Sequence, residues 1–477
     1  MENQAEPRAR RSPVPAVVRR RPLLAGAVTG SLVLAAVLLC VPFGEPPVAR
    51  APAAPAPGAR AGTAVVAGAP AAPADLGELI GQRERAVRRQ PQDARSWALL
   101  GTAYVEQGRR TGDAAGSYPK AERALRTSLR VGPDNSDDLA ALDGLAALAV
   151  ARRDFRAALG WSESALEAAP KRWSAYPSLI DACTGLGDYK RAYAALGRLR
   201  RLKSGPAVLA RAAEVYRERG WREDAAAALS DAAAAAPGPA EQAAWLERGG
   251  QLAFERGDRE DALRHFEEAV RLDPRLGAAQ AGRGRALAAL GRTGQALSAY
   301  RTALARQPLP QYALELGELQ ESLGLRQAAG AQYDLVRERV RRDAAGGVDG
   351  DLVLGLLEAD HGDPVAAVRL LRAEWRRQPG IDVADALGWA LHRIGQDTEA
   401  LGYATVATDR EHGGTVRSAP YVYHRGVIEQ AMGRSGAARR HLEEALRINP
   451  YFSPLGAPGA RAALAQVGEP PDVGVPR

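Results

Sequence analysis

The sequence predicts an all-α protein in which pairs of helices repeat along the chain as a solenoid. The main observation is one spacing that occurs three times in the 477 residues. Small residues, one large apolar residue and a closing proline follow one another at steps of 7, 5, 4, 3 and 5 residues. The first copy comprises Gly250, Gly257, Ala262, Phe266, Ala269 and Pro274, and the other two begin at Gly284 and Gly426. The first two copies start 34 residues apart, and this period is typical of a helix–turn–helix solenoid.

Each position of the spacing has a physical role in a pair of helices. Gly250 lies within the first helix, where the missing side chain allows the second helix to approach closely. Gly257 ends the first helix in a left-handed cap that needs no Cβ atom. Phe266 lies one turn from each alanine of the second helix and fills the space between repeats. Pro274 closes the second helix because proline cannot continue one.

The fullest opening of a repeat identifies the family that the spacing resembles. It consists of Trp97, Leu100, Gly101, Tyr104 and Gly108. Together with the three copies above, it resembles the tetratricopeptide repeat. The resemblance implies a right-handed superhelical solenoid of about ten helix pairs over residues 75–466, with capping helices at both ends. An insertion around Thr111–Pro119 in the first repeat is expected to form a loop.

The N-terminal part of the chain predicts a membrane anchor. Residues 22–43 carry no charge over about 20 residues, which is enough for one transmembrane helix. Six arginines lie in the basic tail of residues 1–21, and the positive-inside rule places that tail in the cytoplasm and the repeats outside. Residues 44–74 are rich in proline and alanine and are expected to form a disordered linker. Residues 467–477 are expected to form a disordered tail.

A cleaved export signal is the main alternative, and it would give a secreted protein with the same repeats. The residues after the apolar segment, from Pro42 onward, offer no small-residue cleavage site of the usual kind. Arg20 and Arg21 loosely resemble a twin-arginine signal. Cys40 lacks the small preceding residue that a lipoprotein needs. The uncleaved anchor is therefore the leading prediction.

Charge and motifs exclude several classes of function. The formal net charge is +8, but half of this excess lies in residues 1–50, with seven arginines and three glutamates. The remaining balance is too small to indicate nucleic-acid binding. The sequence has no phosphate-binding loop, no H-E-x-x-H or C-x-x-C motif and no nucleophile elbow. We therefore expect no enzymatic activity and no cofactor.

The histidines leave one alternative function open. His392, His412 and His424 fall in the last two repeats, where a surface cluster could make the protein a metal- or ligand-handling accessory of an envelope or transport system. His361 lies in a turn between two aspartates, which offers too few ligands for a metal site. Solvated or helix-terminal histidines are the expectation, and no metal ligand is assigned.

The resemblance implies that the first helix of each repeat lines a concave groove in which a partner binds. In the middle repeats the residues expected to face this groove are mostly acidic: Glu214, Glu218, Glu247, Phe254, Glu255, Glu318 and Glu321. In the last two repeats they are mixed: Asp385, Trp389, His392, Arg393, Tyr423 and Gln430. Trp389 follows Gly388, which leaves the adjacent position open. Its indole is therefore expected either to anchor a partner or to pack against a neighbouring repeat.

These observations predict a membrane-anchored extracytoplasmic scaffold that binds a protein or peptide partner in its groove. The positions that clamp acidic chaperone tails in other arrays of this family hold Ala98, Thr102 and Asp143 here, among others. A clamp for acidic tails is therefore not expected. The sequence does not identify the partner.

Overall fold

The computed structural model describes residues 56–132, 136–410 and 415–468. These residues form twenty-three α-helices and one short 3-10 helix, η1 (Trp173–Ala175), and they contain no strand. The expected transmembrane segment, residues 22–43, and the basic tail before it lie outside the described residues. In the described part of the chain, no helix is both long and apolar enough to cross a bilayer.

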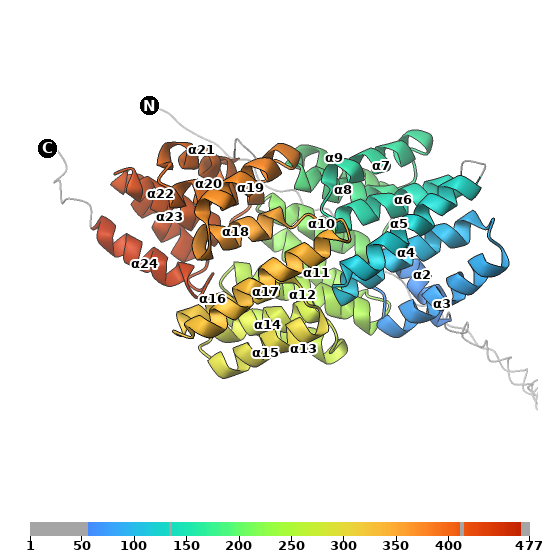
Figure 1. The fold of residues 1–477 in the computed structure, drawn as a ribbon, viewed down its shortest axis with the longest axis horizontal. Coiled ribbons are helices and arrows are strands. Elements are labelled where there is room, and N and C mark those ends of the chain that lie inside the picture. The colour runs from blue at the N-terminus through green and yellow to red at the C-terminus, as the bar shows by residue number, and fades with distance from the viewer. Residues whose placement is uncertain (1–55, 133–135, 411–414, 469–477) are drawn as a thin grey trace, which may run out of the picture. The chain divides into compact units, whose positions relative to one another are not determined.

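Twenty of the helices form ten consecutive hairpins, which is the number of repeats that the sequence predicts (Figure 1). The first helices of the hairpins are α4 (Ala94–Thr111), α6 (Ser136–Ala151), α8 (Tyr176–Gly185), α10 (Pro206–Glu218), α12 (Pro239–Glu255), α14 (Gly277–Ala289), α16 (Pro310–Ser322), α18 (Asp351–His361), α20 (Ile381–Arg393) and α22 (Ala419–Ala431). The second helices are α5 (Ala114–Val131), α7 (Phe155–Ala168), α9 (Tyr189–Leu202), α11 (Arg222–Ala234), α13 (Arg259–Leu272), α15 (Thr293–Arg306), α17 (Arg326–Ala344), α19 (Pro364–Arg377), α21 (Asp397–Thr408) and α23 (Ser435–Ile448).

Two further helices precede the first hairpin and one follows the last. α2 (Pro57–Val66) packs against α3 (Pro73–Arg89), and α24 (Gly456–Val467) contacts α22 and α23. α2 lies within the expected disordered linker of residues 44–74, so residues 57–66 of that segment form a helix instead, while residues 44–55 lie outside the described residues. Ala61 and Val65 of α2 are buried in the same core cluster as Leu79 of α3. The alanine-rich composition of this part of the chain therefore serves helix packing.

The insertion around Thr111–Pro119 does not form a loop, contrary to expectation. α5 begins directly after Asp113, whose carboxylate caps the helix by accepting a hydrogen bond from the amide of Gly116 at 3.1 Å. Pro119 lies inside α5, next to the buried Tyr118. The aspartate cap and the burial of the tyrosine outweigh the helix-breaking tendency of the proline.

Phe266 shows how the repeated spacing closes the core between two repeats. Its side chain is fully buried between the first helices α12 and α14. A Cβ atom on Gly250 of α12 would lie 2.8 Å from the ring, and one on Gly282 of α14 would lie 2.2 Å from it. The size of the ring therefore requires both glycines, which confirms the role predicted for Gly250.

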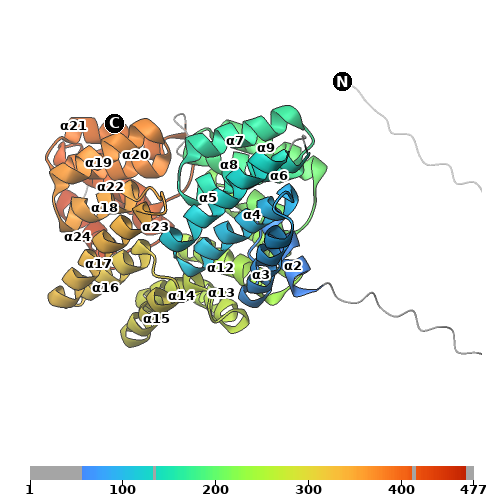
Figure 2. The ribbon, with the colours of Figure 1, turned by 45° about the vertical axis from the view of Figure 1, so that its right-hand side comes forward.

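In each of the first five hairpins, the turn between the two helices contacts a loop from the second half of the solenoid. For the first hairpin this is the loop after the sixth, and for the fifth hairpin it is the loop after the tenth. Figure 2 shows the early helices α5 to α9 next to the later helices α18 to α20. One such contact joins Arg156, at the start of α7, to the carbonyl of Arg377 at the end of α19, at 2.6 Å. Hydrogen bonds of this kind join Gln307 to Arg109, Gly346 to Arg152, Ile381 to Tyr189, Arg417 to Arg222 and Asn449 to Phe254. The bonded residues are 192 to 198 positions apart in the sequence. Successive superhelical turns therefore lie directly against each other.

Candidate binding groove

The first helices carry charged side chains on their inner surface, and most of these charges are paired within the chain. Glu214 of α10 accepts a hydrogen bond from Arg211 at 2.6 Å and also contacts Arg248 of α12. Arg211 in turn contacts Asp181 of α8. One ion-pair network thus joins three successive first helices. A partner could engage Glu214 only by displacing an arginine.

Glu218 and Glu255 share the guanidinium of Arg217. Both carboxylate oxygens of Glu255 accept hydrogen bonds from Arg217, at 2.7 and 2.9 Å, and Glu218 accepts one at 2.5 Å. Burial opposes the ionisation of Glu255, but Arg217 and a hydrogen bond from Gln251 outweigh it and hold the pKa of Glu255 below its usual value. Burial raises the pKa of Glu218 to about 7, although Arg217 acts in the opposite direction.

Glu247 of α12 and Glu318 of α16 differ from these residues. Neither forms a hydrogen bond or ion pair with any residue that the structure describes. Burial raises the pKa of Glu247 to about 7. Burial, and then the carboxylates of Glu315 and Asp360, raise the pKa of Glu318 to about 8. Phe254, which the sequence places in the groove, is 5% exposed and belongs to the core.

Glu321 forms the acidic side of a small cluster with a histidine and a tyrosine. Its carboxylate accepts a hydrogen bond from the hydroxyl of Tyr333 at 2.6 Å and lies 3.1 Å from Nδ1 of His361. The imidazole of His361 stacks on the ring of Tyr333, with 4.2 Å between the centroids. Burial lowers the pKa of His361, although Glu321 acts in the opposite direction. This histidine is therefore part of the packing between α16, α17 and α18.

Trp389 packs against neighbouring repeats, which is the second of the two expectations for it. Only 7% of its surface is exposed. The indole Nε1 donates to both carboxylate oxygens of Asp360 on α18, at 3.0 Å each. The ring stacks on His424 of α22 with 4.3 Å between the centroids. His424 lies 3.0 Å from both carboxylate oxygens of Asp385, and this carboxylate raises the pKa of His424 against the effect of burial.

The other candidates in the last two repeats are also held by neighbours. Nδ1 of His392 lies 2.6 Å from the carboxylate of Asp397, and the guanidinium of Arg393 lies 3.4 Å from that of Asp360. Tyr423 contacts the ring of Trp389 at 5.9 Å between centroids. The structure therefore brings together Asp385, Trp389, His392, Arg393 and Tyr423. Gln430 lies apart from them and donates a hydrogen bond to Gln466 of α24 at 3.2 Å.

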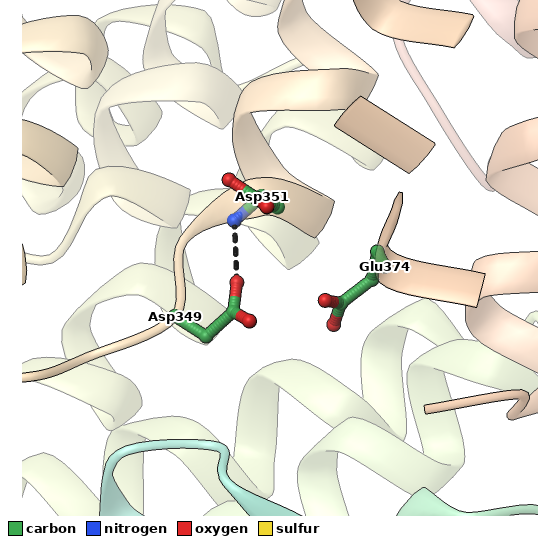
Figure 3. Close-up of side chains that lie close together, drawn as sticks. All are labelled: Asp349, Asp351 and Glu374. Atoms are coloured by element: carbon green, nitrogen blue, oxygen red, sulfur yellow. Dashed lines mark hydrogen bonds between the residues drawn. The ribbon is translucent and has the colours of Figure 1, made fainter. Parts of the chain in front are cut away.

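One group of three carboxylates among the described residues has the spacing of a cation site. Figure 3 shows Asp349, Asp351 and Glu374 with their carboxylates close to one another. Nη2 of Arg377 lies 2.6 to 2.8 Å from an oxygen of each of the three. This guanidinium already supplies the positive charge that the group needs. The histidines considered for a metal site are not in this group, and His412 lies outside the described residues.

Two of the cavities among the described residues lie along the first helices and bear on the candidate groove. The larger, of about 600 Å³, is lined by side chains of α4, α6, α8, α10 and α12, and by Asp382 and Tyr421 from the following superhelical turn. The smaller, of about 340 Å³, lies between α14, α16 and residues 450–461. The smaller volume is at the lower end of the range for ligand pockets, and the larger is near its middle. They suit inserted side chains or a short extended segment better than a whole helix.

Sequence reasoning missed the residues that reach the inner surface from the following superhelical turn. Tyr451 and Phe452 line the smaller cavity, and Tyr421 lines the larger one. A sequence feature that could have indicated these contacts is a polar residue directly before the proline that closes a repeat. The side chain of this polar residue hydrogen-bonds to the preceding superhelical turn. Residues of this kind are Asp273, Gln307, Gln378 and Asn449. That any residue of the inner surface binds a partner stays a prediction.

Ten stacked hairpins with a charged inner surface define a solenoid of helix-pair repeats. Residues 248–308 and 282–346 match the family model of the tetratricopeptide repeat. This part of the chain is therefore built from tetratricopeptide repeats, as the resemblance of its spacing implies.

Solved structures of several repeat proteins resemble the chain at low sequence identity. A tetratricopeptide repeat protein from Parabacteroides merdae is 17% identical, with 55% of this chain and 99% of that chain covered and a TM-score of 0.33. A monomeric IFIT1 mutant with Gppp-AAAA is 17% identical, with 71% and 76% covered and a TM-score of 0.43. Yeast Tom70 is 14% identical, with 77% and 96% covered and a TM-score of 0.32. No curated protein matches the sequence.

Proposed function

We propose that this protein is a non-enzymatic scaffold that binds a protein or peptide partner on the inner surface of its repeats. The observation that carries this proposal is the cavity of about 600 Å³ whose wall combines five first helices with side chains of the following superhelical turn. Five arginines line it, namely Arg109, Arg153, Arg211, Arg217 and Arg248. A surface with so many donors in a partly enclosed site favours a polar partner segment over an apolar one.

The partner segment is expected to enter the interior as an extended chain. Adjacent superhelical turns are joined by hydrogen bonds such as that from Asn449 to the carbonyl of Phe254, at 2.7 Å. The two inner cavities, of about 340 and 600 Å³, can hold side chains or a short extended segment but not the broad face of a partner domain. A partner domain would therefore remain outside and present a peptide segment.

Site-specific photo-crosslinking in cells tests this proposal. A benzophenone amino acid at Asp382, which lines the larger cavity, is expected to capture a partner. The matched control is the same probe at Arg264 of α13, whose side chain is 72% exposed on a second helix. Adducts of equal yield at both positions, or no adduct at Asp382, would contradict binding on the inner surface.

The proposal also places the scaffold outside the membrane, anchored by residues 22–43. Its support is the uncharged length of this segment and the arginines that precede it. Protease added to intact cells should digest the repeats and leave the tail of residues 1–21 protected. Repeats found free in the medium would instead support the cleaved export signal, and repeats protected in intact cells would reject the proposed topology.

A further inference from the structure

The smaller inner cavity, of about 340 Å³, is built from two superhelical turns. One wall comes from α14 and α16 and the other from the segment between α23 and α24. Four aromatic side chains line the cavity, namely Phe254, Tyr300, Tyr451 and Phe452. Rings from positions about 200 residues apart therefore meet only because the superhelical turns lie against each other.

Two carboxylates in the wall of this cavity have different surroundings. Glu315 accepts two hydrogen bonds from Arg285, at 2.7 and 3.2 Å, and one from the hydroxyl of Tyr300 at 2.8 Å. Glu318 lies one helical turn further along α16 and has no such partner among the described residues. The cavity thus contains one satisfied carboxylate and one that lacks a counter-ion.

The aromatic rings of the cavity already attract cations of the chain itself. The guanidinium of Arg285 lies 5.6 Å from the centre of the Phe254 ring, and that of Arg259 lies 4.1 Å from the centre of the Tyr451 ring. Ring faces stabilise positive charge through their quadrupole, and the effect grows when water is excluded. Rings and a carboxylate around the same cavity therefore define an environment for a further organic cation.

We infer that this cavity binds the alkylammonium group of a lysine side chain from the partner, with Glu318 as its counter-ion. The inference rests on the proposed function, since the lysine belongs to the segment bound on the inner surface. A divalent metal fits less well, because hard cations require several oxygen ligands and only one carboxylate is available. Arg461 also lines the cavity, but its guanidinium donates to the carbonyl of Pro450 at 2.9 Å at an exposed position.

Binding of short peptides to the full-length protein in detergent micelles tests the inference. The probe is a glycine-flanked lysine peptide, and the control is the same peptide with norleucine, which has the same carbon chain without the charge. The lysine peptide is expected to bind about tenfold more tightly. Equal affinity for the two peptides would overturn the inference. Choline binding more tightly than the lysine peptide would also overturn it, because a quaternary ammonium ion would then be the better ligand.

Variants of the cavity wall identify the counter-ion. Glu318→Gln should weaken binding of the lysine peptide about tenfold, whereas Glu267→Gln, on the solvent side of α13, should leave it unchanged. Phe452→Leu removes one ring and should weaken binding about threefold. Circular dichroism checks that each variant is folded. Unchanged binding by both cavity variants would show that the lysine binds elsewhere.

The pH dependence of binding gives an independent readout. Glu318 is packed beside Glu315 and Glu321 of its own helix, Asp360 of α18 and Arg285 of α14. Burial and the three carboxylates raise the pKa of Glu318 to about 8, while Arg285 acts against them. The ammonium group requires the ionised carboxylate, so the affinity should rise about twentyfold between about pH 6.5 and pH 8.5. Calorimetry should detect one proton released on binding near neutral pH, and affinity that does not change with pH would contradict the role of Glu318.

The photo-crosslinking experiment separates this inference from the proposed function. The benzophenone probe at Asp382 is used with and without the Glu318→Gln change. Loss of most of the adduct on Glu318→Gln supports the lysine site. An adduct that persists unchanged overturns the lysine site but leaves the scaffold function in place, and no adduct in either protein contradicts the scaffold function itself.

Discussion

The turns of the first five repeats and those of the last five look alike in sequence but have different surroundings. Gly187 in the third repeat and Gly291 in the sixth both end a first helix with positive φ, at 76° and 73°. A Cβ atom on Gly187 would lie 2.6 Å from the carbonyl oxygen of Pro379. A Cβ atom on Gly291 would have no described atom within 4 Å. The backbone angle alone requires the second glycine, whereas the first is also required by a neighbouring superhelical turn.

The same difference recurs along the chain. Glycines at this position in the early repeats approach the next superhelical turn: Gly112, Gly187, Gly220 and Gly257. In four of the five later repeats this glycine faces open space: Gly291, Gly324, Gly395 and Gly433. Gly362 of the eighth repeat is the exception, because its φ is −154° and a Cβ atom there would lie against Glu358. In the first half of the solenoid, glycine at this position therefore allows both the left-handed backbone angle and the close approach of the next superhelical turn. In the second half, except at Gly362, it is needed only for the backbone angle.

The largest expected effect is that of Gly187→Ala. The new Cβ atom must displace the connection at Pro379 and also adopt a left-handed backbone angle, so we expect a loss of about 3 kcal/mol in the free energy of unfolding. Gly291→Ala is the matched control and should lose only about 1 kcal/mol, from the backbone angle alone. Urea unfolding followed by circular dichroism measures both. Equal losses would show that the superhelical turns do not press on Gly187.

Asn449→Ala probes the contact between superhelical turns from the other side. Asn449 is 2% exposed, donates to the carbonyl of Phe254 and accepts a hydrogen bond from the amide of Tyr451. Its loss leaves buried polar groups without a partner, which should lower the free energy of unfolding by about 2 kcal/mol. Thr302→Ala removes an exposed hydrogen bond within α15 and should change it by less than about 0.5 kcal/mol. If the effect of Asn449→Ala were as small as that of the control, this hydrogen bond would not stabilise the contact between superhelical turns.

Asp343→Asn tests the pH dependence of the contact between α17 and α5. Burial raises the pKa of Asp343 from 3.8 to about 6, although Arg339 and Arg342 act in the opposite direction. The folded protein holds this proton more tightly than the unfolded chain, so stability falls as the pH rises from about 4 to about 6. Asp343→Asn should therefore be about 1 to 2 kcal/mol more stable than the wild type at pH 7 and equally stable at pH 4. A difference that does not vary with pH would assign the effect to packing.

The smallest expected effect is that of Arg153→Gly. The second repeat has Arg153 where the other early turns have glycine, and its φ of 61° is left-handed. Glycine should relieve this backbone strain and stabilise the protein by up to about 1 kcal/mol. Thermal unfolding measures the change, with Arg301→Gly, at an exposed position within α15, as the control that should destabilise. A loss of stability from Arg153→Gly would mean that the arginine side chain, which lies 5.5 Å from the ring of Phe155, outweighs the strain.

The hairpins and their internal packing could be predicted because they depend on residues close in sequence. Gly250 and Phe266 are separated by only 16 positions, and their contact follows from the helix period. The helix α2 was missed because proline and alanine in residues 44–74 match both a linker and a helix that begins with Pro57. The contact between superhelical turns could not be predicted, because it results from small rotations added over five repeats.

The candidate site was predicted less well than the fold, for a related reason. The first-helix positions indicate which side chains face inward, but not which of them find a partner there. Glu255 and Glu318 occupy similar inner positions, yet Arg217 neutralises the first and no described residue neutralises the second. Trp389 could be assigned to the packing only once Asp360 and His424 were placed beside it.

The contacts between residues 192 to 198 positions apart have a consequence for folding. In most solenoids each repeat touches only its neighbours, so stability is a sum of local terms and folding can spread from any point. Here each of the first five repeats gains its contact with the following superhelical turn only after the repeat five units later has formed. Folding should therefore be cooperative over the whole array and slow, as expected for a chain of high contact order. Deletion of a single repeat would shift every later contact out of register.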